Sequence, residues 1–144
     1  MTEFRREVAN RLEKASKNKE LKRSASEFME NSINSQYSYN FFWLGRPIIQ
    51  YPQDILAIQE LVFKIKPDLI IETGIAYGGT TILYASLLSL LDNLEGINPR
   101  ESSSKVISID IDIREHNYIA IKEHPLQDKI IMIEGSSIDK NIFN

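Results

Sequence analysis

The most informative stretch of this 144-residue chain is Asp68-Leu-Ile-Ile-Glu-Thr-Gly-Ile-Ala-Tyr-Gly-Gly-Thr-Thr81. It opens with a short apolar run, which is typical of a strand buried on both faces of a parallel sheet. Glycines follow at 74, 78 and 79, and after them an apolar segment runs to about Leu91. The stretch therefore predicts a strand, a glycine-rich turn and a long helix.

Outward from this stretch, helix and strand signals keep alternating. Helices are expected over 52–66, 78–91 and 114–123, and strands over 68–73, 105–110 and 129–134. Residues 136–139 are typical of the start of a further helix. Alternating strands and helices predict right-handed crossovers. We expect an α/β fold with a Rossmann-like, doubly wound parallel sheet that is partial, with about three strands.

The first 52 residues have a different character, and we expect them to form an N-terminal helical and aromatic cap on a domain that covers 53–144. Apolar residues at 4, 8, 12 and 15 predict a helix, 16–27 predicts a break or a frayed helix, and 28–33 a second short helical face. The aromatic residues between 37 and 52, mixed with glycine and proline, predict an ordered irregular segment.

Charge and composition limit the possible functions. Hydrophobic residues make up 42% and charged residues 26%, as in a soluble globular protein, and cysteine is absent, which excludes disulfides and thiolate metal sites. Residues 1–23 carry eight Lys or Arg against four Glu. Because these charges are mixed in sign, a solvated helix face is favoured over a phosphate, lipid or glycan site. Without a signal peptide or a membrane-spanning segment, we expect a cytoplasmic protein with no nucleic-acid partner.

The end of the strand at 68–73 carries the first candidate site. Glu72 is followed by glycines in the order G-x-x-x-G-G, which differs from the dinucleotide pattern G-x-G-x-x-G. One acid and free backbone donors suit the ammonium and carboxylate of S-adenosylmethionine. The predicted cofactor-binding residues here are Glu72, Thr73, Gly74, Ala76, Tyr77, Gly78, Gly79 and Thr80. Alternatively, the glycines serve only helix–strand packing.

Two further strand ends carry candidate residues. Asp110 and Asp112 follow the strand at 105–110, where an acid can accept hydrogen bonds from both hydroxyls of a ribose, and a metal role is the lesser alternative. Gly135, Ser136 and Ser137 follow the third strand. They are candidates to frame an adenine, although a serine helix cap explains them equally well. Both histidines, 116 and 124, are assigned to the surface, and no metal site is predicted.

Four motifs together resemble the cephalosporin hydroxylase family: Trp43-Leu-Gly-Arg-Pro-Ile-Ile-Gln-Tyr-Pro-Gln-Asp, Lys66-Pro-Asp-Leu-Ile-Ile-Glu-Thr-Gly-Ile-Ala-Tyr-Gly-Gly-Thr, Ile107-Ser-Ile-Asp-Ile-Asp and Glu134-Gly-Ser-Ser. The resemblance implies a class I methyltransferase fold and O-methyl transfer to a small molecule, a sugar or a polysaccharide. It also implies that S-adenosylmethionine is bound by the loop 72–80, by Asp110 and by the turn 135–137. Family members use a divalent metal, expected to be Mg, held by acids after the fourth and fifth strands.

The sequence of 144 residues ends before those strands, so the metal ligands have no counterpart in it and no catalytic residue is named. We expect a truncated form: a fragment, a decayed gene product, or a protein completed by oligomerisation or by a second polypeptide. Leu69–Thr73 would then be an exposed apolar edge that pairs with another chain. The competing functional hypotheses are a non-catalytic, partner-binding module and, less favoured, a nicotinamide-dependent enzyme.

Overall fold

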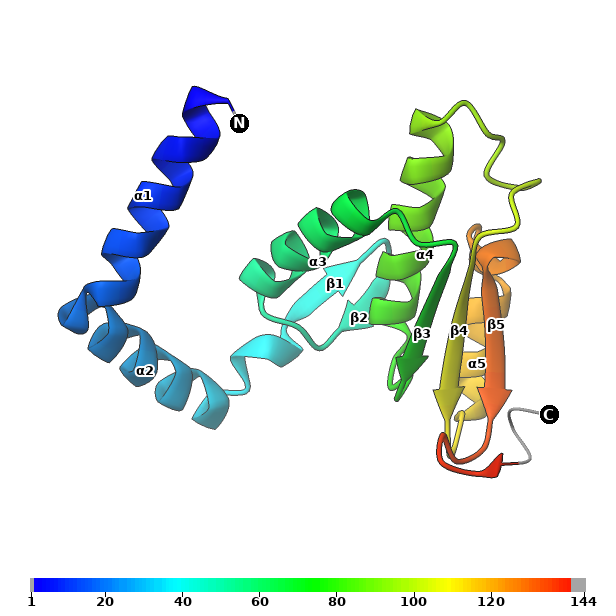
Figure 1. Cartoon of the computed structure of the whole chain (residues 1–144). Helices are drawn as coiled ribbons and strands as arrows, with labels where there is room; N and C mark the ends of the chain where they lie inside the picture. Colours follow the sequence, from blue (N-terminus) through cyan, green and yellow to red (C-terminus); the bar gives the residue numbers. More distant parts are fainter. Residues whose placement is uncertain (1, 141–144) are drawn as a thin grey trace. The chain divides into compact units, whose positions relative to one another are not determined.

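The computed structural model describes residues 2–140. The chain forms two compact units, Met1–Tyr37 and Ser38–Asn144 (Figure 1). The aromatic segment after residue 37 thus folds with the sheet-bearing unit. The predicted boundary between residues 52 and 53, which separates an N-terminal cap from half of a methyltransferase domain, stays a prediction.

The first unit consists of two helices, α1 (Glu3–Lys17) and α2 (Lys19–Asn34). The predicted first helix is confirmed. The predicted break over 16–27 is wrong except at Asn18, which leaves the helical conformation with φ −80° and ψ 102° and whose side chain accepts a hydrogen bond from the Leu21 N–H at 3.0 Å. Residues 19–27 continue as a helix because Lys, Glu, Leu, Arg and Ala are good helix formers even without an apolar pattern.

The second unit begins with a β-hairpin. After a 3-10 turn (Tyr37–Tyr39), strands β1 (Phe41–Trp43) and β2 (Arg46–Ile48) pair in antiparallel fashion. Leu44 and Gly45 have φ values of 44° and 87°, and a tight two-residue hairpin loop requires this left-handed conformation. The segment predicted to be irregular is therefore ordered, as expected, but contains a short hairpin.

The elements after the hairpin are α3 (Pro52–Ile65), β3 (Leu69–Thr73), α4 (Gly79–Leu94), β4 (Lys105–Asp110), α5 (Glu115–Lys122), the 3-10 turn Gln127–Lys129 and β5 (Ile130–Glu134). This order confirms the predicted alternation. Residues 136–139, predicted to begin a helix, form a turn closed by a hydrogen bond from the Asp139 N–H to the Ser136 carbonyl at 2.9 Å. Any continuation beyond residue 140 lies outside the described residues.

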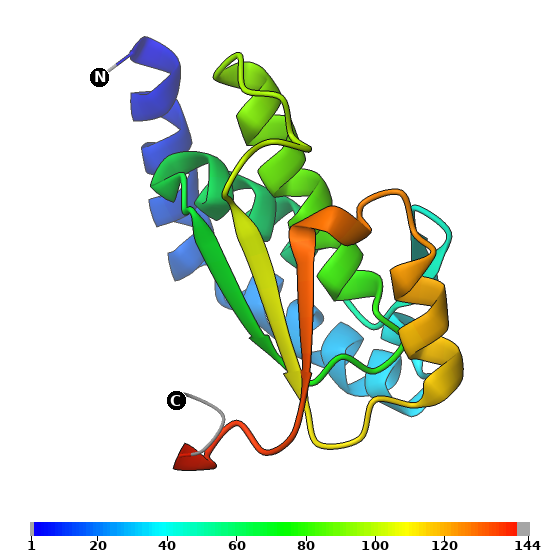
Figure 2. The same cartoon turned by 90° about the vertical axis from the view of Figure 1, so that its right-hand side faces the viewer.

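The three strands form a parallel sheet in the order β3-β4-β5 (Figure 2). Side chains from one face of this sheet share a core cluster with α4 and α5: Ile70, Val106, Ile130 and Met132 pack with Ile82, Ala85, Leu88 and Ile121. Both helices cover the same face because the strand order advances in one direction through right-handed crossovers. The result is a mixed α/β fold with a partial Rossmann-like sheet, as predicted.

On the opposite face of the sheet, the outer strands carry exposed apolar side chains in the described part of the chain. Leu69 and Ile71 of β3 are 47% and 59% exposed, and Ile131 of β5 is 44% exposed. The prediction that the first strand is buried on both faces is therefore wrong. In the described residues β3 is also an edge strand, since it pairs only with β4, and this agrees with the expected apolar edge.

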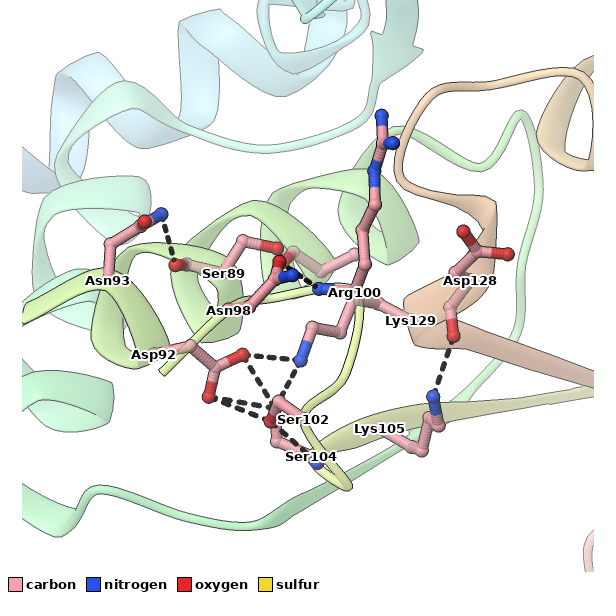
Figure 3. A network of polar contacts seen from close by, with 11 residues as sticks. Ser89, Asp92, Asn93, Asn98, Arg100, Ser102, Ser104, Lys105, Asp128 and Lys129 are labelled. Atoms are coloured by element: carbon pink, nitrogen blue, oxygen red, sulfur yellow. Dashed lines mark hydrogen bonds and ion pairs between the residues drawn. The ribbon is translucent and has the colours of Figure 1, made fainter. Parts of the chain in front are cut away.

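A buried polar cluster joins three elements at the amino ends of the strands (Figure 3). Lys129, just before β5, forms an ion pair with Asp92 of α4, and their side chains are only 3% and 9% exposed. Lys129 Nζ also donates to Ser104 Oγ at 2.7 Å, and Ser102 Oγ donates to Asp92 Oδ1 at 2.9 Å. Ligands of parallel α/β sheets bind at the opposite, carboxyl ends, so we assign this cluster a structural role.

Candidate functional site

The glycine-rich loop between β3 and α4 lies at the carboxyl end of the sheet. Gly74 has a φ of 86°, and a Cβ added there would meet no atom within 4 Å. It therefore gives the turn its left-handed conformation and leaves open space beside the backbone. The Gly74 N–H donates to the Ile109 carbonyl at 2.8 Å, and the Gly78 N–H donates to the Ile75 carbonyl at 2.8 Å. These bonds connect the loop to β4 and close it into a turn.

Gly78 shares the left-handed conformation of Gly74, with a φ of 82°, and both Gly78 and Gly79 are also crowded by neighbouring atoms. A Cβ on Gly78 would lie 2.6 Å from the Ile121 side chain, and one on Gly79 would lie 2.2 Å from the Pro47 carbonyl oxygen. The packing alternative thus accounts for both glycines, although Gly79 packs against the hairpin and not against a strand. Their assignment to cofactor binding stays a prediction that rests on backbone atoms alone.

Asp110 ends β4 directly beside the loop. Its Oδ2 accepts a hydrogen bond from the Ile75 N–H at 2.6 Å, and its Oδ1 accepts one from the Asp112 N–H at 3.2 Å. Desolvation by burial raises the pKa of Asp110, but hydrogen bonds from backbone N–H groups outweigh it and leave the pKa below its ordinary value. Asp110 is therefore a carboxylate at neutral pH, with the backbone N–H groups of Ile75, Ala76, Ile111 and Asp112 directed at its two oxygens.

Glu72 is buried beneath the loop and is held by two hydroxyl groups. Its Oε2 accepts hydrogen bonds from Thr81 Oγ1 at 2.5 Å and from Ser108 Oγ at 2.8 Å. Desolvation raises the pKa of Glu72 above its ordinary value, which these hydrogen bonds partly oppose. Neither hydroxyl residue was among the predicted site residues. The signal that marks them is a polar residue inside an otherwise apolar strand or helix.

Two cavities open on either side of the loop. The first, of about 360 Å³, is lined by Pro47, Ile49, Gln50, Ile71, Glu72, Thr73, Gly74, Ile75, Ala76, Tyr77, Gly79, Thr80 and Tyr84. The second, of about 310 Å³, is lined by Ala76, Tyr77, Asp110, Asp112, Arg114 and Asn117. The structure thus gathers most of the predicted residues around one loop, with Ala76 and Tyr77 facing both cavities. Gln50, Tyr84, Arg114 and Asn117 are further lining residues that sequence reasoning did not identify.

Among residues 2–140, a backbone hydrogen bond joins the third predicted segment to this site. The Gly135 N–H donates to the Asp110 carbonyl at 2.7 Å. Ser136 Oγ accepts from the Ile138 N–H at 3.4 Å, which is a local turn contact. Neither Gly135 nor the two serines, 136 and 137, belong to the lining of either cavity, and their assignment to the adenine stays a prediction.

The described residues contain no gathering of three or more His, Cys, Asp or Glu side chains that could hold a metal ion. Asp110 and Asp112 line the same cavity, but no third ligand joins them among residues 2–140. His116 is exposed, as predicted, whereas His124 is half-buried and its Nε2 lies 3.1 Å from the Leu44 carbonyl oxygen. No helix in the described part of the chain is long and apolar enough to cross a membrane.

A family described as Rhamnosyl O-methyltransferase/CmcI matches residues 35–144. Two solved structures are similar. "cmcI-N160 SAH" is 19% identical with a TM-score of 0.51, and the match covers 67% of this chain and 43% of that chain. "CmcI-N160 apo-structure" is 21% identical with a TM-score of 0.55, and the match covers 73% of this chain and 40% of that chain. At these identities the likeness shows the fold, and the chain spans less than half the length of either structure. No curated protein sequence matches the chain.

Proposed function

The chain belongs to the Rhamnosyl O-methyltransferase/CmcI family, and on this premise we propose that its sheet-bearing unit binds S-adenosylmethionine for O-methyl transfer. This is the cephalosporin hydroxylase family that the four motifs resemble, so that prediction is confirmed. The name of one similar structure includes SAH, the demethylated product of this cofactor. The proposal rests chiefly on one observation: two cavities with complementary chemistry meet at the loop 74–80.

The first cavity suits the amino-acid end of the cofactor. Both hydroxyl donors to Glu72 bond to Oε2, which leaves Oε1 to accept a hydrogen bond from the ligand ammonium. Gly74 leaves open space beside the backbone at the same wall, and the start of α4 offers N–H groups to the ligand carboxylate. An ammonium at this position also offsets the cost of ionising a buried carboxyl group.

The second cavity suits the ribose. Asp110 is ionised and its two oxygens are fixed by backbone N–H groups, so it can accept one hydrogen bond from each of two neighbouring hydroxyls. Asp112 lines the same cavity and is exposed. With both ends held, the sulfonium lies near Ala76 and Tyr77, where the two cavities meet. The same proposal includes the acceptor, which would be a small molecule, a sugar or a polysaccharide, and a role of this chain in O-methyl transfer itself.

Calorimetric titration with S-adenosylmethionine tests this function. We expect the unmodified protein to bind, Asp110→Ala and Gly74→Val to lose binding, and Asp54→Ala to bind normally, because Asp54 is an exposed acid on α3 away from both cavities. NAD titrated in parallel tests the nicotinamide alternative. A folded protein that binds neither compound would exclude the cofactor role and favour the non-catalytic module.

The non-catalytic alternative has one structural observation in its favour: the outer edge of β3 has no partner strand among residues 2–140. This strand presents N–H and C=O groups on its outer side and exposed Leu69 and Ile71 on its open face. Such an edge favours pairing with another strand. We propose that a second copy or a complementing polypeptide occupies it, and methyl transfer measured with and without such a polypeptide separates a catalytic role from a purely partner-binding one.

A further inference from the structure

The side chain of Arg46 reaches from the hairpin to the glycine-rich loop. Its Nε and Nη2 both donate to the Tyr77 carbonyl, at 2.9 and 2.6 Å, and Nη2 also donates to Asn117 Oδ1 at 2.9 Å. Arg46 is half-buried. A planar guanidinium can bind a carbonyl in this forked way, whereas an ammonium cannot.

Asn117 completes the arrangement from α5. It is 3% exposed, and its Nδ2 donates to the Ala76 carbonyl at 2.8 Å. Its amide group is thus engaged at both ends, by Arg46 on one side and by Ala76 on the other. Asn117 lines the second cavity, and both polar atoms of its amide already make a hydrogen bond to the protein. We call Arg46 and Asn117 the loop clamp.

The loop clamp holds a backbone conformation that is costly by itself. Ala76 has a φ of 47°, in the left-handed region that disfavours residues with a Cβ. In a trans peptide the C=O and the following N–H point in opposite directions. The bond from Asn117 to the Ala76 carbonyl therefore also fixes the direction of the Tyr77 N–H, in the part of the loop that faces both cavities.

The hairpin that carries Arg46 is itself firmly anchored. Trp43 Nε1 donates to Ser86 Oγ of α4 at 3.1 Å. The Pro47 carbonyl lies so close to Gly79 that no Cβ would fit there. The backbone of Arg46 is therefore held against the start of α4. Hydrogen bonds fix the guanidinium at the other end, so this long side chain can hold the loop in place.

We propose that Arg46 and Asn117 are positioning residues that pre-organise the loop 74–80 for its ligand and act through the Ala76 and Tyr77 carbonyls without touching the ligand. This inference rests on the proposed cofactor function for its effect on affinity. The order of the loop in the ligand-free protein does not depend on that function.

Three substitutions separate the parts of the loop clamp. Arg46→Ala removes both bonds to Tyr77, and Arg46→Lys keeps the charge but loses the fork. Asn117→Asp keeps the acceptor for Arg46 and loses the donor to Ala76, placing a carboxylate against a carbonyl. Arg100→Ala is the matched control, because Arg100 lies in the loop at the amino end of the sheet and lines neither cavity of the site (Figure 3).

Two readouts are measured for each variant: the Kd for S-adenosylmethionine by calorimetry, and amide hydrogen exchange in the ligand-free protein. We expect the Kd to rise about tenfold in Arg46→Ala and in Asn117→Asp, with a smaller rise in Arg46→Lys and none in Arg100→Ala. In Arg46→Ala and Asn117→Asp, the backbone amides of Ile75 and Gly78 should exchange about tenfold faster than in the unmodified protein. The amides of the strand residues Ile107 and Ile109 should keep their rates, which would exclude global destabilisation.

Unchanged exchange at Ile75 and Gly78, or equal acceleration in loop and strands, would overturn the positioning role. If the unmodified protein does not bind S-adenosylmethionine, the proposed function fails. The exchange rates of the ligand-free variants then decide the role of the loop clamp by themselves, with faster loop exchange supporting it and unchanged exchange overturning it.

Discussion

At the scale of single residues, two carboxyl groups on neighbouring strands are held by different donors. Asp110 is half-buried at the end of β4, and backbone N–H groups overcome the effect of burial on its pKa. Glu72 is buried one strand away, and burial dominates although two hydroxyls donate to it. The pKa of Asp110 is lowered and that of Glu72 is raised. Such a divergence is a mark of a functional site.

The raised pKa of Glu72 predicts a pH dependence of stability. A carboxyl group whose pKa is higher in the folded protein contributes stability that is complete below its unfolded value, near 4.5, and is lost as pH rises through the folded value. The free energy of unfolding of the unmodified protein, relative to that of Glu72→Gln, should therefore fall over this window. Urea titrations at a series of pH values measure the difference, and parallel curves for the two proteins would contradict the raised pKa.

Asp110 predicts the opposite slope. Because its pKa is lowered in the folded protein, its contribution is complete above the unfolded value, near 3.8, and is lost as pH falls through the folded value. The advantage of the unmodified protein over Asp110→Asn in free energy of unfolding should shrink on acidification. The same urea series tests this, and Asp54→Asn serves as the exposed control.

Ligand binding should also be linked to proton release. A cofactor ammonium near Glu72 lowers the raised pKa of this group, so near that pKa the complex holds fewer protons than the free protein. Affinity for S-adenosylmethionine should weaken as pH falls through the pKa of Glu72 in the free protein. Calorimetry in buffers of different ionisation enthalpy detects the released protons, and Glu72→Gln should abolish the release.

At the scale of elements, the start of α4 packs against both the hairpin and α5. Gly74 requires its left-handed φ but faces open space, whereas Gly79 faces the Pro47 carbonyl. Gly74→Ala should therefore cost about 1 kcal/mol, from backbone strain alone. Gly79→Ala should cost more, about 2 to 3 kcal/mol, because backbone atoms of the hairpin must move. Urea unfolding of the two variants compares these costs, and equal costs would show that the hairpin yields easily.

The buried ion pair at the other end of α4 gives a second prediction at this scale. Removing one partner, as in Lys129→Met or Asp92→Leu, leaves an uncompensated buried charge and should cost about 3 to 5 kcal/mol. The double variant should be more stable than the sum of the two single losses suggests, since it buries no charge. Urea unfolding of all four proteins forms the double-mutant cycle, and additive losses would mean that the two charges do not interact.

At the scale of the whole molecule, the sheet is covered on one face only in the described part of the chain. Pairing at the edge of β3 should make association of this chain depend on concentration. Leu69→Lys places a charge on that edge strand outside both cavities and should reduce self-association while leaving cofactor affinity unchanged. Sedimentation over a range of concentrations measures this. A monomer at all concentrations would point instead to a complementing polypeptide.

Much of the architecture follows from the sequence by itself. The order of helices and strands, the turn at Gly74 and the position of Asp110 at a strand end are marked by local signals: apolar periodicity, a glycine where φ must be positive, and an acid directly after a buried strand. These signals extend over a few residues, so they can be read without knowing which segments meet. The helical state of 19–27 was missed because helix-forming residues there carry no apolar pattern.

Only the tertiary structure decided which residues support the loop and why its glycines are needed. Arg46 contacts residues 31 and 71 positions further along the chain, and Glu72 bonds with Ser108, 36 positions away. A polar residue inside an apolar strand or helix can mark one partner, as for Ser108, but no local pattern shows which residues pair before the crossovers bring the segments together. The exposed face of β3 likewise depends on the tertiary structure. The strand order advances in one direction, so both crossover helices lie on the other face of the sheet. An apolar run indicates only that a strand can be buried. Whether the strand is buried depends on which elements pack against that strand.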